Sequence, residues 1–259
     1  MTPGSAARLL DLLAARAGLV CAVGAGGKKS TLYRLAEAHL AAGSAPVGLT
    51  CTVSMGPPPR SLPAHRLVAT WEDLAAEVPA LARRHRLLAY AGPSAKPGRV
   101  GGVPGELLAR LHAEGGFAVT LVKADGARMR WLKAPREDEP VLPPGPATVL
   151  AVVSIRALGQ LLEPTIAHRI ERVAAVTGAA LGARLEPAHL ARLLSSPEGA
   201  LQGVGAATVV PVLNMVDDPA REAGARQVAE RALAATDRFD RVVLTSMIAP
   251  DPVVDVITR

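Results

Sequence analysis

Residues 23–36 read VGAGGKKSTLYRLA, with three glycines in four positions before two lysines, a serine and a threonine. The apolar run just before, GLVCAVG at 18–24, predicts a buried strand. The segment just after, STLYRLAEAHLAAG at 30–43, has helical spacing and ends in a glycine that suits a helix C-terminus. A strand, a glycine-rich loop and a helix in this order are typical of a phosphate-binding loop.

The loop contains the chemistry that phosphate binding requires. Glycines let backbone N–H groups turn inward around an anion, a lysine neutralises the outer phosphates, and a hydroxyl binds Mg²⁺. The loop is shorter than G-x-x-x-x-G-K-[ST], because Lys28 and Lys29 lie four and five residues after Gly24, where the standard motif has six. We therefore expect a shortened, deviant phosphate loop. The expected nucleotide-binding residues are Gly24, Ala25, Gly26, Gly27, Lys28, Lys29, Ser30 and Thr31.

Either lysine could hold the phosphate. Lys29 precedes Ser30 directly and keeps the Lys-Ser-Thr order, whereas Lys28 follows Gly27 directly and keeps the Gly-Lys pair. Spacing alone slightly favours Lys29. The alternative without function is a tight glycine-rich turn with two solvated lysines.

Strands and helices alternate along the rest of the chain. This alternation predicts an α/β fold with a mostly parallel sheet flanked by helices, resembling P-loop NTPases. We expect one domain over residues 1–259, with a helical segment at about 164–202 that breaks near Gly178, Pro187 and Pro197. The other expected strands are 47–53, 67–70, 86–92, 117–126, 148–155, 207–217 and 240–247, and the other expected helices are 6–16, 71–86, 104–116 and 219–235.

Ligands in such folds bind beyond the carboxyl ends of the strands. That rule selects four loops, which are 24–31, 51–56, 124–133 and 214–217.

Composition narrows the function classes. The 259 residues include 29 Lys and Arg against 23 Asp and Glu, but the arginines are scattered and no aromatic platform accompanies them, so we expect no nucleic-acid partner. No apolar run is long enough to span a membrane. Cys21 and Cys51 are isolated in apolar runs, which fits a reduced, cytoplasmic protein, and no Cys/His cluster has zinc-ligand spacing.

Only five of the cations are lysines, two of them in the glycine-rich loop and two around ADGARMRWLKAP. Because arginine is the usual cation of this chain, a retained lysine suggests a specific task. In this block, Asp125 follows an apolar strand and could hold Mg²⁺ or its water shell together with Ser30, while Lys133 could reach an anionic substrate. An ordinary Asp-Gly turn is the alternative.

The stretch NMVD at 214–217 is similar to the guanine-reading N-K-x-D motif of GTPases. Asp217 would accept hydrogen bonds from the base, and the thioether of Met215 could cover it in place of the lysine. We expect Asn214 and Asp217 to contact a nucleotide base, with guanine slightly ahead of adenine. A polar turn after a strand is the alternative.

Taken together, VGAGGKKSTL, LTCTV, ADGARMRWLKAP, EDEPVLP, AHRIE and VLNMVD resemble the YqeC-type accessory proteins of selenium-dependent molybdenum hydroxylases, over about residues 18–255. The resemblance implies a P-loop-type nucleotide-binding protein in selenium cofactor maturation. It favours Lys28 as the loop lysine. It also marks Gly24, Gly26, Gly27, Asp125, Gly126, Lys133, Pro135, Glu139, Pro140, His168, Arg169, Asn214 and Asp217.

Several positions depart from the family pattern. Lys29 stands where threonine is frequent, Lys123 where an acid is expected before ADGA, and Met215 where lysine is expected. Ser54 and Cys51 also differ, around the second strand. The lysine at 123 weakens a magnesium site with two carboxylates, so nucleotide binding is better supported than hydrolysis.

We therefore expect a protein that binds ATP or GTP with Mg²⁺ and acts as a P-loop NTPase or phosphotransferase. Lys28, Lys29 and Asp125 would be catalytic, and Lys133, Glu139, His168 and Arg169 would contact the substrate. The expected partner is a selenium-dependent molybdenum hydroxylase or one of its maturation proteins. The alternatives are a docking or chaperone module that binds nucleotide without hydrolysing it, or one that binds none.

Overall fold

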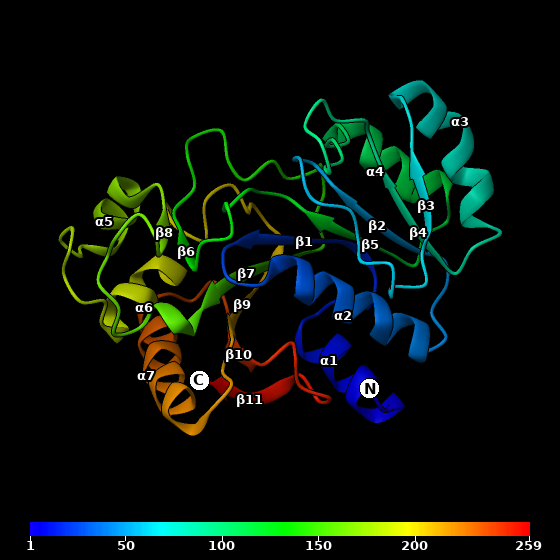
Figure 1. The fold of residues 1–259 in the computed structure, drawn as a ribbon. Coiled ribbons are helices and arrows are strands. Elements are labelled where there is room, and N and C mark those ends of the chain that lie inside the picture. The colour runs from blue at the N-terminus through cyan, green and yellow to red at the C-terminus, as the bar shows by residue number, and fades with distance from the viewer. The chain divides into compact units, whose positions relative to one another are not determined.

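The computed structural model describes residues 1–259, which form two compact units (Figure 1). Unit 1 comprises Met1–Ala22, Lys29–Gly126 and Val141–Thr148, and unit 2 comprises Val23–Lys28, Ala127–Pro140 and Val149–Arg259. The chain passes between the units at both ends of the glycine-rich loop. The prediction of one domain stays a prediction.

Unit 1 is built on parallel strands in the order β1, β5, β2, β4, β3. All but the edge strand β3 are buried along almost their whole length, as expected for apolar strands covered on both faces. The strands are β1 (Gly18–Gly24), β2 (Val47–Cys51), β3 (His65–Val68), β4 (Leu87–Ala91) and β5 (Val119–Lys123).

Four helices accompany these strands: α1 (Pro3–Leu12), α2 (Lys28–Ala41), α3 (Trp71–Ala82) and α4 (Gly105–Glu114). Thr2 and Thr70 cap α1 and α3, because each side chain accepts a hydrogen bond from a backbone N–H of the first turn. Helix α3 packs beside α4 and β4 (Figure 1). Leucine, valine and alanine make up most of the core, as the aromatic-poor composition predicts.

Unit 2 contains strands in the order β7, β9, β10, β11, with β9 and β10 parallel and β10 and β11 antiparallel. A second, two-stranded parallel sheet pairs Leu132 with Ala167 and Lys133 with His168. The strands are β6 (Leu132–Lys133), β7 (Thr148–Ser154), β8 (Ala167–His168), β9 (Thr208–Asn214), β10 (Arg241–Thr245) and β11 (Val253–Thr258).

The helices of unit 2 are the 3-10 turn η1 (Ile155–Ala157), α5 (Ile170–Thr177), α6 (Pro187–Ser195) and α7 (Pro219–Ala235). The three predicted breaks at 164–202 are confirmed, since Gly178 ends α5 in a left-handed conformation, Pro187 begins α6, and α6 ends before Pro197. Only α5 and α6 are helical in that segment. Helix α7 packs against α6, β10 and β11.

The predicted fold class is confirmed: the chain is α/β, with mostly parallel strands flanked by helices. Most strands are shorter than predicted, and two features were not predicted. Strand β11 is half-exposed, so its apolar signal is weak, and the β6–β8 pair is too short for a periodicity.

Candidate functional site

The glycine-rich loop is the three-residue turn between β1, which ends at Gly24, and α2, which begins at Lys28. The backbone φ angles of Gly24, Gly26 and Gly27 are 89°, 83° and 134°. Residues with a Cβ rarely adopt such angles, so the backbone path of this loop requires glycine.

Close packing imposes a second requirement for glycine. A Cβ on Gly24 would overlap the carbonyl of Val152, and one on Gly26 would overlap Ser154. A Cβ on Gly27 would overlap the side-chain nitrogen of Asn214. Ser154 ends β7 and Asn214 ends β9, so within unit 2 the loop lies against the carboxyl ends of two strands.

The two lysines after the loop have different surroundings. Lys28 is 5% exposed, and its Nζ donates a hydrogen bond to the carbonyl of Gly24, so its side chain folds back along the loop. Lys29 is half-buried in unit 1, where a Cβ on Gly56 would lie 3.6 Å from its Nζ. Of the two hydroxyls that follow, Ser30 is exposed and Thr31 is buried.

The side chain of Asn214 forms a hydrogen bond with the glycine-rich loop. Its Nδ2 donates to the carbonyl oxygen of Gly26 at 2.9 Å. Its Oδ1 accepts from Thr245 Oγ1 at 3.1 Å and from the backbone N–H of Met247 at 3.4 Å. Both ends of this buried amide therefore connect the loop to the end of β10.

Asp217 lies in the turn after β9 and is held by two side chains. Its carboxylate accepts from Ser246 Oγ at 2.7 Å and pairs with Arg221 at 3.2 Å. Met215, which lies between Asn214 and Asp217 in the chain, has a φ of 66°, and its sulfur accepts a hydrogen bond from Ser154 Oγ at 3.1 Å. The NMVD turn is thus tied to β7 and β10 as well as to the loop.

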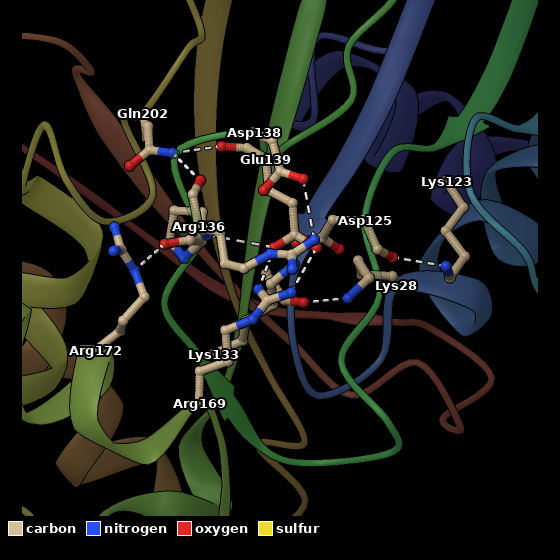
Figure 2. A network of polar contacts seen from close by, with 12 residues as sticks. Lys28, Lys123, Asp125, Lys133, Arg136, Asp138, Glu139, Arg169, Arg172 and Gln202 are labelled. Carbon is tan, nitrogen blue, oxygen red and sulfur yellow. Dashed lines mark hydrogen bonds and ion pairs between the residues drawn. The ribbon is translucent and has the colours of Figure 1, made fainter. Parts of the chain in front are cut away.

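A charged network in unit 2 centres on Glu139. The side chain of Lys133 is fully buried, and its Nζ lies 2.8 Å from Glu139 Oε2. Arg169 binds the same carboxylate with both terminal nitrogens, one of them at 2.9 Å from Oε1 (Figure 2). The register of β6 and β8 explains this convergence, because it sets Lys133 opposite His168, next to Arg169.

The network shifts the pKa values of two groups. Burial alone would raise the pKa of Glu139, but hydrogen bonds from Arg169 and Lys133 outweigh it and lower the value to about 2. Burial lowers the pKa of His168 to about 4, and the charges of Arg169, Lys133 and Arg128 add to this effect. At neutral pH, Glu139 is therefore ionised and His168 is uncharged.

Hydrogen bonds from two side chains to backbone carbonyls fix the segment that carries Glu139. Arg172 Nε donates to the carbonyl of Pro135 at 2.6 Å. The amide of Gln202 donates to the carbonyls of Arg136 and Glu139 (Figure 2). Sequence reasoning missed Arg172 and Gln202, and no motif marks them, because they act on backbone groups of a loop.

In unit 1, Asp125 lies just after β5 and is 2% exposed. Lys123 Nζ donates to the backbone oxygen of Asp125 at 2.6 Å (Figure 2). The backbone N–H of Thr52 donates to the carbonyl of Lys123, so the loop after β2 begins beside the end of β5. Lys123, a departure from the family pattern, holds the turn that carries Asp125.

Backbone strain is concentrated in the candidate segments. Five residues other than glycine have positive φ, and four of them are Arg128, Met129, Arg169 and Met215. Each left-handed residue with a side chain costs about 1 kcal/mol. Arg128 and Met129 are the central residues of a turn closed by the bond from Arg130 N–H to Ala127, which sequence does not predict, since such turns favour glycine and asparagine.

The cysteines do not provide an alternative chemistry. Both are buried, and burial raises the pKa of Cys21 to about 12 and that of Cys51 to about 11. The thiolate is the nucleophile, so neither residue is activated for thiol transfer. Cys51 lines an apolar cavity of about 50 Å³ in unit 1, with Met55, Pro57 and Val100 among its walls.

No helix in this structure combines the length and apolarity needed to cross a membrane. No group of three or more His, Cys, Asp or Glu side chains has an arrangement suited to a metal ion.

Fold and site together define an α/β protein in which a strand, a tight glycine loop and a helix precede a buried charged network. A family model described as YqeC protein matches residues 20–171. An Escherichia coli (strain K12) protein, "Uncharacterized protein YqeC", is 33% identical over 191 residues, which cover 72% of this chain and 71% of that protein. The chain therefore belongs to the YqeC family. No solved structure matches it.

The family match contains the glycine-rich loop, Asp125, Lys133, Glu139, His168 and Arg169. Asn214 and Asp217 lie beyond its end at residue 171.

Proposed function

We propose that this protein binds ATP or GTP with Mg²⁺ through residues 24–31, and that it serves the maturation of selenium-dependent molybdenum hydroxylases in the cytoplasm. One observation supports nucleotide binding: three glycines with positive φ form a tight turn into α2, and the side chain of Lys28 folds back onto this turn to bind the carbonyl of Gly24. The maturation role rests on membership of the YqeC family.

Backbone N–H groups of residues 25–30 would hold the phosphates, helped by the dipole of α2. Lys28 is the better candidate for neutralising the transferred phosphoryl group, because it follows the last loop glycine and folds back along the loop. Lys29 belongs to unit 1, where its Nζ would lie 3.6 Å from a Cβ on Gly56. The surroundings of the lysines thus favour Lys28 over the spacing argument.

Ser30, together with Asp125 or a water molecule bound to it, would hold Mg²⁺, which would supply positive charge to neutralise the phosphates. The exposure of Ser30 and the burial of Thr31 make Ser30 the accessible hydroxyl. With a phosphate donor bound, Lys133, Glu139, His168 and Arg169 would contact the second substrate, and the reaction would be phosphoryl transfer to water or to that substrate.

A second candidate function is a nucleotide-gated docking module that does not hydrolyse. It is favoured by Lys123, which brings a positive charge to the turn of Asp125 where a second carboxylate would strengthen a magnesium site. The partner in either case would be a selenium-dependent molybdenum hydroxylase or one of its maturation proteins, with no nucleic-acid or membrane partner. Turnover only with the client present would favour the docking module.

The test is calorimetric titration of the purified protein with Mg-ATP and Mg-GTP, repeated with Lys28→Ala and Lys29→Ala. The two variants remove the same charge from adjacent positions, so each is the control for the other. We expect micromolar binding that Lys28→Ala abolishes and Lys29→Ala weakens only slightly. Absence of binding at millimolar nucleotide would refute the proposal.

A further inference from the structure

The glycine-rich loop runs alongside the end of β7 within unit 2. The backbone N–H of Ala25 donates to the carbonyl of Val152 at 2.8 Å. A Cβ on Gly26 would lie 2.3 Å from the Cβ of Ser154, the last residue of β7. The short turn that follows β7 therefore begins beside the loop.

Arg156 lies in this turn, two residues after Ser154. Ser154 caps the turn, because its Oγ accepts the backbone N–H of Arg156 at 3.2 Å. The backbone N–H of Ser154 in turn donates to the carbonyl of Trp131 at 3.3 Å. Ser154 thus contacts Arg156, Trp131 and the glycine-rich loop at the same time.

The side chain of Arg156 is held by an aromatic ring instead of a carboxylate. Its guanidinium carbon lies 4.9 Å from the centre of the Trp131 ring. The residue is exposed, and its guanidinium takes part in no hydrogen bond or ion pair within the chain. Trp131 itself is half-buried, so it provides a fixed surface for the mobile arginine side chain.

Stacking of this kind leaves the hydrogen-bonding groups of arginine available. The ring contacts one face of the planar guanidinium, whereas the five N–H groups point outward in its plane. Two of these groups on one edge match two oxygens of a phosphate. Because Trp131 already restricts the side chain of Arg156, less conformational entropy is lost when a phosphate binds.

We propose that Arg156 binds the phosphate chain of the nucleotide from the side of β7, and that Trp131 orients it. Neither residue belongs to the glycine-rich loop or to the Glu139 network. The assignment rests on the proposed function, because the phosphates are those that the loop amides and Lys28 would hold. Arg156 would then be a phosphate-binding residue, and Trp131 a positioning residue.

The fluorescence of Trp131 gives a direct readout. The chain has two tryptophans, and Trp71 is 53% exposed, so Trp71→Phe isolates the emission of Trp131 at little cost in packing. A phosphate that binds Arg156 changes the charge over the Trp131 ring. Mg-ATP, Mg-GTP and inorganic triphosphate should therefore change the emission, whereas adenosine and guanosine should not.

Two results of this titration would contradict the proposal. An equal response to the nucleosides would assign Arg156 to the base instead of the phosphates. An unchanged emission with a nucleotide that calorimetry shows to be bound would place the phosphates away from the Arg156–Trp131 pair.

Two variants that each remove one exposed positive charge form a matched pair. Arg156→Gln changes the stacked residue, and Arg231→Gln changes an exposed residue of α7. We expect Arg156→Gln to weaken the binding of Mg-nucleotide about tenfold, as for loss of a hydrogen bond between charged groups. Arg231→Gln should leave binding unchanged, and equal weakening by both would reduce the effect to net charge and overturn the proposal.

The role of Trp131 is tested in two backgrounds. Trp131→Leu should weaken nucleotide binding about threefold, as for loss of an exposed cation–π contact, and Trp131→Phe should restore most of it. In the Arg156→Gln background, Trp131→Leu should have no further effect, because the residue that it orients is absent. The same loss in both backgrounds would show that Trp131 does not act through Arg156.

Calorimetry separates failure of this assignment from failure of the proposed function. Binding that is lost in Lys28→Ala but unchanged in Arg156→Gln would overturn the role of Arg156 and leave the loop as the nucleotide site. If the wild type bound no nucleotide at millimolar concentration, the proposed function and this assignment would both be refuted.

Discussion

The side chain of Asn214 carries three hydrogen bonds, one to the glycine-rich loop and two to the end of β10. Asn214→Asp separates them, because a carboxylate still accepts from Thr245 and Met247 but cannot donate to Gly26. We expect a loss of about 1–3 kcal/mol in the free energy of unfolding, from one buried carbonyl without its donor. Nucleotide affinity should fall as well.

Denaturant unfolding and calorimetry measure the two effects. Thr245→Val is the control, since it removes only a bond on the β10 side. If Asn214→Asp and Thr245→Val changed nucleotide affinity equally, Asn214 would not act through the loop.

A second residue-level prediction concerns the need for glycine in the loop. Gly27→Ala meets both a φ of 134° and an overlap with Asn214, whereas Gly43→Ala meets a φ of 78° in open space. Gly43→Ala should cost about 1 kcal/mol, as for one left-handed residue with a side chain. Gly27→Ala should cost clearly more and abolish nucleotide binding, measured by denaturant unfolding and calorimetry. Equal costs would contradict the packing argument.

At the level of elements, the β6–β8 pair and the loop of Glu139 predict a specific pH dependence. The pKa of Glu139 falls from 4.5 to about 2 on folding, so its contribution is complete above pH 4.5 and is lost as the pH falls towards 2. Glu139→Gln should therefore be less stable than the wild type at pH 7, by about 3 kcal/mol. The difference should shrink below pH 4.5.

Urea unfolding from pH 7 to pH 3 tests this expectation. The depressed pKa of His168, about 4 against 6.5, acts in the neighbouring window, so wild-type stability should already fall between pH 6.5 and 4. Asp138→Asn is the matched control, because Asp138 pairs with Arg136 on the surface. A pH-independent difference between Glu139→Gln and the wild type would exclude an ionised network.

Elements with a strong apolar pattern could be predicted from the sequence, and those fixed by tertiary contacts could not. The 18–24 strand and the 219–235 helix have the predicted bounds. The β6–β8 pair has no periodicity of its own, and it exists because the segment around Lys133 lies along that around His168. The same contact creates the Glu139 network. The sequence predicted its members as separate candidate residues but did not predict that they form one cluster.

For the whole molecule, the rule that ligand loops follow strands selected four loops, and the structure brings them together in pairs within each unit. The loops at 24–28 and 214–217 meet in unit 2, and in unit 1 the loop after β2 begins beside the end of β5. The division into two units could not be anticipated, because the chain passes between them at Ala22/Val23 and Lys28/Lys29, within an uninterrupted motif. Spacing along the sequence slightly favoured Lys29 over Lys28, because spacing carries no information on the burial and contacts of the two side chains.

Nucleotide binding should raise the thermal stability of the whole molecule by mass action. A ligand at 100 times its Kd stabilises the folded state by about 2.7 kcal/mol. For a chain of this size, that corresponds to a rise in Tm of about 5–11 °C. Scanning calorimetry with Mg-ATP and Mg-GTP measures it, with Lys28→Ala as the variant that should lose the rise and Lys29→Ala as the one that should keep it.

The same scans test base recognition. Asn214 is engaged by the loop and β10, and Asp217 by Ser246 and Arg221, so a base must compete with existing bonds for either side chain. We therefore expect ATP and GTP to raise Tm to a similar extent at equal concentration. The expectation would be wrong if GTP alone raised Tm and Asp217→Asn removed that rise. Asp217 would then release Arg221 to bind guanine, and the turn after β9 would determine nucleotide specificity.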